Sequence, residues 1–476
     1  MTLKTPEIDG TRPGPRLGTT PPDRPKQPRV AVIGGGSSGL VTVKTLIEYE
    51  LDVVCFEQGR DVGGLWVYNN SNGRGGTYRS LHINTSKRQT QFPDFPMPDS
   101  WGDYPHHSDI ARYLASYSHH FQLTPHIRFE HEVIRCRALT HGGYEIAFKH
   151  TDQTEAFDAI VVANGHHFSP LLPESRSYEN FTGHTLHSYD YRSPTEPFSL
   201  AGKRIVVVGM GNSAMDIACE LSRIHPTQVS VSARRGAWVM PKYLRGKPID
   251  GPAVIPHYLP AKLRRQLVTR AFQFVHGSMT DFGLPEPDHL IGEAHPTIST
   301  EFPSLVKSGD IKMRAGFSHC EKELVHFNDG SSTPADVLIF CTGYRVDFPF
   351  FEPDHIQAHN NQLPLFFRTF HLSERHVFFV GLLQTIGAVM PVAAAQARAI
   401  ALHLAGLYNL PLASEMQHIH AAHEKKMKER FVPSARHTMQ IIPEDFHVAL
   451  AKELAAGVRR AQRSLGQAFS LQGTDT

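Results

Sequence analysis

The chain of 476 residues is long for one hydrophobic core, and its length predicts two or three domains. With 40% hydrophobic and 20% charged residues and a formal net charge of +2, it has the composition of an ordinary globular protein, which excludes the basic surface of a nucleic-acid binder. It contains no run of the ~20 apolar residues that a membrane span requires and no signal-peptide core. We therefore expect a soluble, cytoplasmic protein whose partner is a small molecule.

The cysteines and histidines predict neither dithiol chemistry nor a metal site. Adjacent histidines such as His106 and His107 point in different directions, and no HExxH or Cys/His cluster accompanies them. The five cysteines stand singly, without a CxxC pair, as expected for reduced thiols in a reducing compartment: Cys55, Cys136, Cys219, Cys320 and Cys341.

Order is predicted to begin at residue 29. Residues 1–28 carry seven prolines and little apolar periodicity, so we expect a disordered leader. Residues 29–33 form a short apolar run typical of a buried parallel strand. A turn with GxGxxG spacing follows and is expected to open a helix whose N-terminus faces a pyrophosphate: Gly34, Gly35, Gly36, Ser37, Ser38 and Gly39.

The next strand completes this nucleotide motif. The strand expected at residues 51–56 is followed by Glu57, eighteen residues after Gly39. A carboxylate at this position is expected to hydrogen-bond ribose hydroxyls. Strand, turn, helix, strand and acid together predict a dinucleotide site. The alternative is that the glycines serve only a tight structural turn.

A second motif of the same kind follows a second buried strand at residues 205–208. Its turn and helix start comprise Gly209, Gly211, Asn212, Ser213, Ala214, Met215 and Asp216. The following strand, residues 228–232, leads to Arg234 and Arg235 rather than to an acid, which favours a ribose bearing a 2′-phosphate and hence NADPH over NADH. The alternative is that the two arginines form a solvated basic loop.

Two further apolar runs, residues 159–165 and 337–343, end in glycine and indicate where the chain passes between domains. We therefore expect an α/β fold with two Rossmann-like dinucleotide-binding domains. The first spans 29–195 and 325–455 and is interrupted by the second at 196–324. A C-terminal tail covers 456–476.

The segment between the two turns carries a family resemblance. Phe181, Gly183, His187 and Tyr191 fit the pattern FxGxxxHxxxY, and the sequence here resembles the flavin-containing monooxygenases, a family of class B flavoprotein monooxygenases. The related Baeyer–Villiger enzymes usually end the pattern in tryptophan. We expect the pattern to link the two domains, with His187 either bracing their orientation or serving as a structural histidine.

Other segments extend the resemblance from about residue 29 to about residue 455. Residues 62–66 resemble the flavin-contacting GGLW segment, residues 83–87 the active-site asparagine loop, and residues 340–344 the ATGY-type strand end, with Cys341 in place of alanine. Residues 381–391 and 436–438 resemble late segments of the vertebrate enzymes. We expect no C-terminal membrane anchor of the kind that the vertebrate members carry.

The resemblance implies FAD at the first turn and NADPH at the second. It also implies O2 as co-substrate and oxygenation of a nucleophilic nitrogen or sulfur through a C4a-hydroperoxyflavin. The resemblance places these residues at FAD, in addition to the first turn and Glu57: Gly64, Leu65, Trp66, Asn84, Thr85 and Gln384. It places Ile83 at NADPH, together with the second turn and its two arginines. Asn84 is the expected catalytic residue, because an amide donates hydrogen bonds to an oxygenated flavin without titrating.

Several alternatives stay open. Trp66 and its neighbours are equally compatible with plain core packing, and Asn84 with a structural loop role. A disulfide reductase would need a reactive cysteine pair, which the spacing does not provide. A Baeyer–Villiger enzyme would act on ketones, and a non-oxygenating FAD/NADPH redox protein would have little use for Arg234. By analogy with relatives we expect a homodimer.

Overall fold

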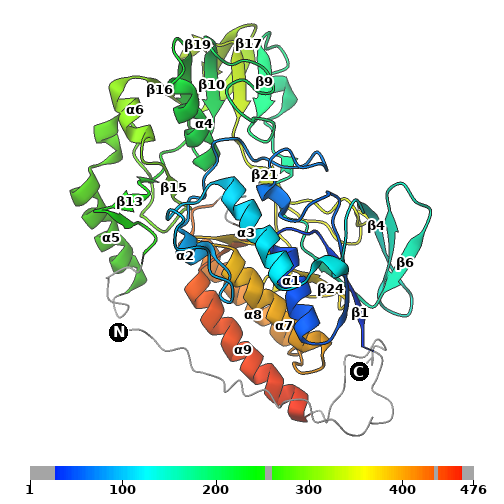
Figure 1. Cartoon of the computed structure of the whole chain (residues 1–476). Coiled ribbons are helices and arrows are strands. Elements are labelled where there is room, and N and C mark those ends of the chain that lie inside the picture. Colours follow the sequence, from blue (N-terminus) through cyan, green and yellow to red (C-terminus); the bar gives the residue numbers. More distant parts are fainter. Residues whose placement is uncertain (1–26, 252–259, 434–437, 464–476) are drawn as a thin grey trace.

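The computed structural model describes residues 27–251, 260–433 and 438–463. It shows a mixed α/β fold built on two sheets with parallel centres, which confirms the fold expected from the two glycine turns (Figure 1). The leader predicted at 1–28 lies almost entirely outside the described residues. So does the end of the tail predicted at 456–476, whereas residues up to Arg463 belong to a helix, α9 (Pro443–Arg463).

The first sheet has seven strands in the order β22-β23-β24-β7-β1-β2-β3. At its centre, β1 (Arg29–Ile33) pairs in parallel with β2 (Asp52–Phe56) and with β7 (Ala159–Val162), and β24 (Val377–Phe379) follows β7. Buried apolar side chains on both faces of β1 produce the uninterrupted apolar run seen in the sequence. The outer strands are β3 (Ile127–Arg128), β22 (Leu365–Phe366) and β23 (Phe370–His371).

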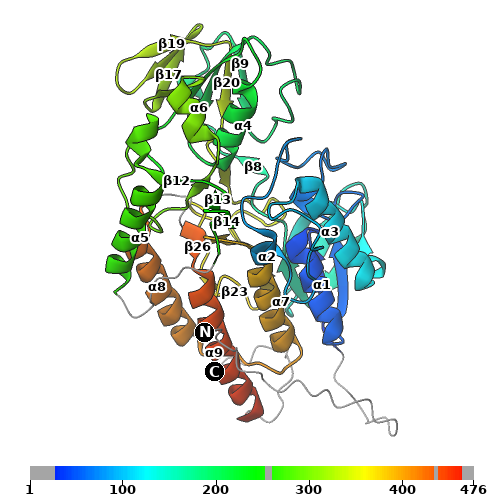
Figure 2. The ribbon, with the colours of Figure 1, turned by 60° about the vertical axis from the view of Figure 1, so that its left-hand side comes forward.

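Each face of this sheet is covered by a different layer. Val30 and Val32 belong to a core that includes side chains of α1 (Ser37–Glu48), α3 (His107–His120) and α7 (Met390–Leu404). Ala31 and Ile33 face a second core, formed with an antiparallel sheet of β4 (Val133–Ala138), β5 (Tyr144–Phe148) and β6 (Thr154–Phe157). The long helix α9 packs against α7, and the helix α8 (Ala413–Arg430) packs against β22 (Figure 2).

The second sheet has five parallel strands in the order β16-β11-β10-β20-β9. The strands are β9 (His184–His187), β10 (Arg204–Val208), β11 (Gln228–Ser232), β16 (Ile311–Arg314) and β20 (Val337–Phe340). Two helices, α4 (Asn212–Ser222) and α6 (Phe302–Ser308), contribute to the core on one face. The other face packs against β17 (Phe317–Glu321), β18 (Leu324–Phe327) and β19 (Ser332–Pro334).

The strands of the second sheet reach beyond the expected 196–324 unit on both sides. β9 precedes residue 196, and β20, which sequence assigned to the first domain, pairs with β10 and β9. A buried run such as Val337–Phe340 fits the centre of any parallel sheet, so its sequence does not indicate which sheet it joins. The chain passes between the sheets at β8 (Ser169–Pro170) and β21 (Tyr344–Arg345), which pair antiparallel.

The remaining elements are short, apart from α5 (Ala261–His276). They are α2 (Lys87–Thr90), β12 (Val239–Met240), β13 (Tyr243–Leu244), β14 (Lys247–Pro248), β15 (Thr297–Ile298), β25 (Gln384–Thr385), β26 (Gln440–Ile441) and 3-10 turns at Gly64–Trp66, Thr124–His126, Ser175–Ser177 and Met279–Phe282. Across the described ranges, no helix is both long enough and apolar enough to cross a membrane.

Candidate functional site

The first glycine turn has the geometry that a dinucleotide requires. Gly34 has a φ of +110°, and a Cβ there would lie 2.6 Å from the carbonyl oxygen of Ala163 at the end of β7. A Cβ at Gly39 would overlap the carbonyl oxygen of Gly34. Gly36, the N-cap of α1, is different, because the nearest atom to a Cβ added there would be Gly64 Cα at 3.7 Å. Gly34 and Gly39 are thus needed by the fold, whereas Gly36 leaves space for an approaching pyrophosphate.

Glu57 lies at the end of β2, beside this turn, as predicted from its spacing. Its carboxylate accepts hydrogen bonds from the backbone N–H groups of Gly35 and Gly59, each at 2.7 Å. Burial raises the pKa of Glu57, although these N–H groups act in the opposite direction. The carboxylate therefore fixes the turn in addition to any role toward a ribose.

The GGLW segment packs on the first turn. The N–H of Gly63 donates to the carbonyl oxygen of Gly35 at 3.0 Å, and Gly64 approaches Gly36. Trp66 packs against the core of the first sheet, whereas Leu65 is 41% exposed. The segment thus lies beside the first turn, with part of the Trp66 side chain packed on the core.

The loop that carries Asn84 lies between the two domains. Ile83 is buried and donates its N–H to the carbonyl oxygen of Pro105 at 3.1 Å, and Thr85 accepts from the Thr90 hydroxyl at 3.3 Å. Within the described chain, the partly exposed Asn84 side chain has no hydrogen-bond partner. Its amide therefore remains available to a ligand.

Two neighbours tie this loop in place. The N–H of Ser86, the N-cap of α2, donates to Asp250 Oδ2 at 2.6 Å, and Asp250 belongs to the inserted domain. On the other side α2 packs against α7 of the first domain. The position of Asn84 therefore depends on both domains.

The late segment reaches the first turn from the side opposite Glu57. In the sheet order β24-β7-β1-β2, Glu57 follows β2, and residues 381–385 follow β24. Gly381 packs so closely on Ser38 that a Cβ would overlap the Ser38 hydroxyl. Gln384 follows, and its Oε1 is buried without a hydrogen-bond partner in the described chain. A ligand with a donor at this position would satisfy it.

The second turn repeats the construction of the first. Gly209 has a φ of +128°, and a Cβ there would lie 2.5 Å from the carbonyl oxygen of Cys341 at the end of β20. Gly211 is the N-cap of α4, and Ala214 and Met215 are fully buried against the sheet. Ser213 lies in the first turn of the helix and is partly exposed. The geometry is that of a second dinucleotide site.

Two polar side chains anchor the second turn. Asn212 Oδ1 accepts the N–H of Ile298 at 2.8 Å. Asp216 Oδ2 accepts the hydroxyl of Tyr78, which comes from the first domain, at 2.5 Å. Burial raises the pKa of Asp216 to about 6, against the effect of the Tyr78 hydrogen bond. Both residues therefore support the turn, and Asp216 also connects it to the other domain.

Arg234 and Arg235 both follow β11, and both are exposed. The Arg235 Nε lies 3.8 Å from Asp288 Oδ2, a distance at which the two charges partly neutralise each other. Arg234 packs its Cγ against Gly316 at the neighbouring end of β16. Of the two, Arg234 is the better placed to meet a 2′-phosphate.

The fingerprint residues lie at the edge of the second sheet. Gly183 packs against the Phe181 ring and has no room for a Cβ. Tyr191 is fully buried, and its hydroxyl donates a hydrogen bond to Glu220 Oε2 at 2.7 Å. His187 ends β9, its Nδ1 accepts the N–H of Tyr189 at 3.0 Å, and burial lowers its pKa to about 4. The pattern thus builds the start of the inserted domain, and burial favours the neutral form of His187.

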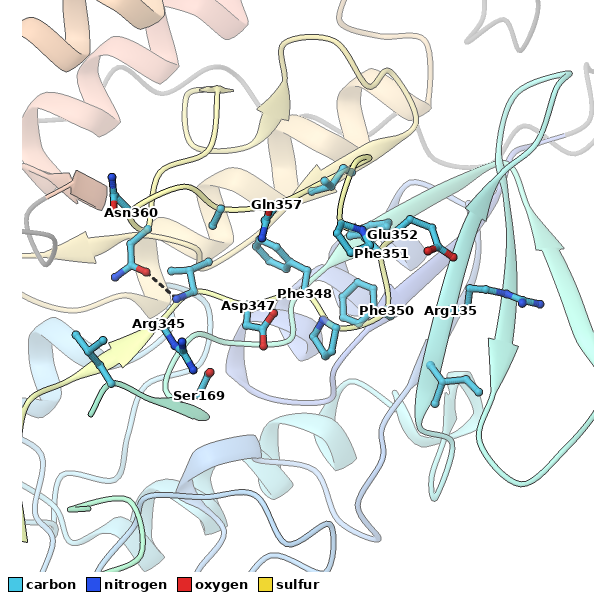
Figure 3. Close-up of a pocket in the computed structure, with 18 residues that line it drawn as sticks. Arg135, Ser169, Arg345, Asp347, Phe348, Phe350, Phe351, Glu352, Gln357 and Asn360 are labelled. Atoms are coloured by element: carbon cyan, nitrogen blue, oxygen red, sulfur yellow. Dashed lines mark hydrogen bonds between the residues drawn. The ribbon is translucent and has the colours of Figure 1, made fainter. Parts of the chain in front are cut away.

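Two cavities lie away from both turns. One of about 720 Å³ lies between β4 and residues 345–361 and is lined by Arg135, Arg345, Asp347 and several phenylalanines (Figure 3). Another of about 750 Å³ lies between α5 and residues 286–293 and includes Asp288, the partner of Arg235. None of the residues lining either cavity is a predicted site residue. Within the described ranges no group of three or more potential metal ligands comes together.

Sequence reasoning missed Tyr78, Asp250 and Gln440, each of which contacts or neighbours a predicted site residue. Tyr78 and Asp250 act across the domain interface, which no local pattern announces. Gln440 pairs in register with Gln384. Its only sequence signal is its place two residues after the segment 436–438, of which 436 and 437 lie outside the described residues.

Comparisons with known proteins agree with this architecture. A profile of flavin-binding monooxygenase-like proteins matches residues 27–460. Flavin-containing monooxygenase 5 of Rattus norvegicus is 36% identical, over 87% of this chain and 80% of its own length. Dimethylaniline monooxygenase [N-oxide-forming] 2 of Macaca mulatta is 32% identical, over 90% and 83%. Among solved structures, S-allyl-L-cysteine S-oxygenase from Allium sativum has a TM-score of 0.67 at 24% identity, covering 94% and 95% of the two chains.

Proposed function

The chain belongs to the flavin-binding monooxygenase-like family, and we propose that it uses NADPH and O2 to oxygenate soft nucleophilic nitrogen or sulfur atoms of small molecules. It is an FAD-dependent monooxygenase, and FAD supplies the electron transfer from NADPH and the activation of O2 when bound. The observation that carries the proposal is the pair of glycine turns joined across the interface by the Asn84 loop, which Asp250 holds from the inserted domain.

The residues present fit FAD at the first turn. Gly36 leaves open space at the helix N-terminus, and Gln384 Oε1 is a buried acceptor without a partner in the described chain. We infer that α1 and Glu57 hold the pyrophosphate and adenosine ribose, and that Leu65, Trp66, Thr85 and Gln384 border the flavin. The Asn84 amide is the donor that holds an oxygen atom at the flavin by hydrogen bonding.

The second turn is assigned to NADPH on the same grounds. Gly209 and Gly211 form the phosphate-binding turn at the start of α4. Arg234 supplies a charge-assisted contact for a 2′-phosphate. We propose that residues 29–195 and 325–455 form the FAD-binding domain and residues 196–324 the NADPH-binding domain. Two strands within the first ranges, β9 and β20, belong to the sheet of the NADPH-binding domain.

Nitrogen or sulfur oxygenation is favoured over Baeyer–Villiger oxidation by two observations. Tyr191 ends the fingerprint, and its hydroxyl has a partner in Glu220, which a tryptophan could not reproduce with the same atom. The relatives above 30% identity include one named for N-oxide formation. Cyclohexanone monooxygenase shares the fold at 17% identity, with a TM-score of 0.67, and supports the architecture alone.

The test compares three substrates side by side. Purified protein with FAD, NADPH and ¹⁸O₂ is given N,N-dimethylaniline, methyl phenyl sulfide or cyclohexanone, and labelled products are identified by mass spectrometry. Labelled N-oxide or sulfoxide in proportion to NADPH consumed is expected. Labelled lactone alone would establish the Baeyer–Villiger alternative, and hydrogen peroxide in place of every product would indicate a non-oxygenating redox protein.

Compartment and assembly are part of the proposal. All five cysteines are unpaired, and four are buried, which supports a reducing, cytoplasmic compartment. A homodimer is proposed by analogy with relatives. Fractionation of source cells tests the compartment, and sedimentation equilibrium of the purified holoenzyme tests the homodimer.

A further inference from the structure

Gln440 is a fully buried glutamine whose entire amide lacks a hydrogen-bond partner in the described chain. Its side chain is 0% exposed, and neither Nε2 nor Oε1 finds a protein partner. Burying an unsatisfied polar group destabilises the folded state, and an amide has both a donor and an acceptor to satisfy. Such an amide persists where a ligand or an ordered water completes its hydrogen bonds.

The neighbour of Gln440 also has a buried amide oxygen without a partner in the described chain. β26 pairs in parallel with β25, and the register sets Gln440 opposite Gln384. Strands in a sheet lie ~4.8 Å apart, so the two side chains emerge close together. Gln384 Oε1 is also buried without a partner in the described residues. Gln440 therefore offers an unused donor and an unused acceptor, and Gln384 an unused acceptor, at one place.

The topology indicates which half of FAD lies there. Glu57, expected at the adenosine ribose, follows β2 on one side of the first turn, and the strand that leads to Gln384 is β24 on the other side. Gly381 packs on Ser38 at the start of α1, three residues before Gln384. A dinucleotide whose pyrophosphate lies at α1 and whose adenosine lies toward β2 extends its flavin half toward β24 and β25.

We propose that Gln440 is a flavin-binding residue, which together with Gln384 hydrogen-bonds the polar edge of the isoalloxazine ring. That edge alternates carbonyl acceptors with an N–H donor, and an amide pair complements such a pattern. The inference rests on FAD occupying the first turn, as the proposed function requires. It assigns a role to the segment after residue 438 that neither glycine turn explains.

Gln396 provides a matched control. It is also 0% exposed, but its amide is satisfied within the protein, with Oε1 accepting from Gly381 N–H at 3.0 Å and Nε2 donating to the Arg368 carbonyl oxygen at 2.8 Å. Methionine has nearly the volume of glutamine without its hydrogen bonds. Gln440→Met and Gln396→Met thus remove the same amide group from equally buried positions. In Gln440→Met the lost amide has no partner in the described chain, whereas in Gln396→Met it is hydrogen-bonded within the protein.

The experiment measures the FAD dissociation constant by flavin fluorescence on dilution of purified holoenzyme, the visible flavin spectrum, and the melting temperature in saturating FAD. Gln440→Met is expected to raise the FAD dissociation constant about tenfold and to shift the flavin absorption bands, with a near-wild-type melting temperature when FAD saturates. Gln396→Met is expected to lower the melting temperature at every FAD concentration.

Two results would overturn the inference. If Gln440→Met keeps the wild-type dissociation constant and spectrum, the amide is satisfied by buried water. If it lowers the melting temperature in saturating FAD as much as Gln396→Met does, with flavin binding intact, its role is structural. Failure of the wild-type chain to bind FAD would instead overturn the proposed function together with the inference.

Discussion

Asp250 accepts the backbone N–H of Ser86 at 2.6 Å, so a carboxylate of the inserted domain holds the loop that presents Asn84 from the first domain. The same domain boundary is crossed by the hydrogen bond from Tyr78 to Asp216 and by that from the Tyr104 hydroxyl to the carbonyl oxygen of Lys242. We propose that Asn84, the expected catalytic residue, is positioned by the domain that is expected to bind NADPH, and that the orientation of the domains and oxygenation are linked in this way.

Replacing Asp250 with alanine is expected to uncouple NADPH oxidation from product formation. The variant loses the acceptor for Ser86, so the Asn84 loop is no longer fixed, and we expect product per NADPH to fall about tenfold as hydrogen peroxide rises. Asp250→Asn keeps an acceptor oxygen and should retain most of the coupling. Equal coupling in wild type and Asp250→Ala would show that the contact does not position the loop.

Asn84→Asp is expected to impair oxygenation more than flavin reduction. A carboxylate accepts hydrogen bonds but does not donate them, so the donor at the oxygen atom is lost, whereas FAD and NADPH remain bound. Stopped-flow measurement of anaerobic flavin reduction, set against steady-state product formation, separates the two steps. Unchanged product formation would reduce Asn84 to a structural loop residue.

Arg234→Ala is expected to raise the KM for NADPH about 10- to 100-fold and to leave the KM for NADH nearly unchanged. The lost interaction is a charge-assisted hydrogen bond to the 2′-phosphate, which NADH lacks. Arg235→Ala serves as the control, because Asp288 already neutralises part of that charge. A variant with equal increases for both nucleotides would contradict the assignment of this turn to NADPH.

The two glycines that flank the start of α1 are expected to fail in different ways. Gly36→Ala should fold with a near-wild-type melting temperature and yet lose FAD, because the new Cβ meets only ordinary contacts in the protein but occupies the space left for the pyrophosphate. Gly39→Ala should lower the yield of folded protein, because its Cβ would overlap the Gly34 carbonyl oxygen. Purification followed by flavin quantification and thermal melting distinguishes them. Full FAD content in Gly36→Ala would refute the pyrophosphate position.

Asp216 is expected to make the protein less stable as pH rises from about 4 to about 6. Its pKa is raised to about 6 in the folded chain from 3.8, so the folded state holds a proton that the unfolded state releases in this range. Asp216→Asn, which mimics the protonated acid, should be more stable than wild type by about 1–3 kcal/mol at pH 7 and similar to it near pH 3.5. Urea denaturation at both pH values measures the gap, and a gap independent of pH would argue against a raised pKa.

The sequence predicted the two nucleotide turns because their determinants are local. Gly34 and Gly209 contact carbonyl oxygens at the ends of neighbouring strands in nearly the same way, and spacing alone marks such turns. The sheet to which β20 belongs was not predictable, since a buried apolar run carries no information about its partners. Asp250 and Gln440 were missed because their importance arises from contacts between distant segments.

The pairing of β8 with β21 governs how the inserted domain is attached. Ser169 and Pro170 lead out toward it and are in register with Arg345 and Tyr344, which lead back. The connection is therefore one two-stranded ribbon rather than two independent tethers. The two strands are hydrogen-bonded to each other, so we expect both connections to shift together whenever the unit that carries Gly209 shifts relative to the unit that carries Gly34. A change in length in one strand of the ribbon would tilt the whole domain unless the other strand changed with it.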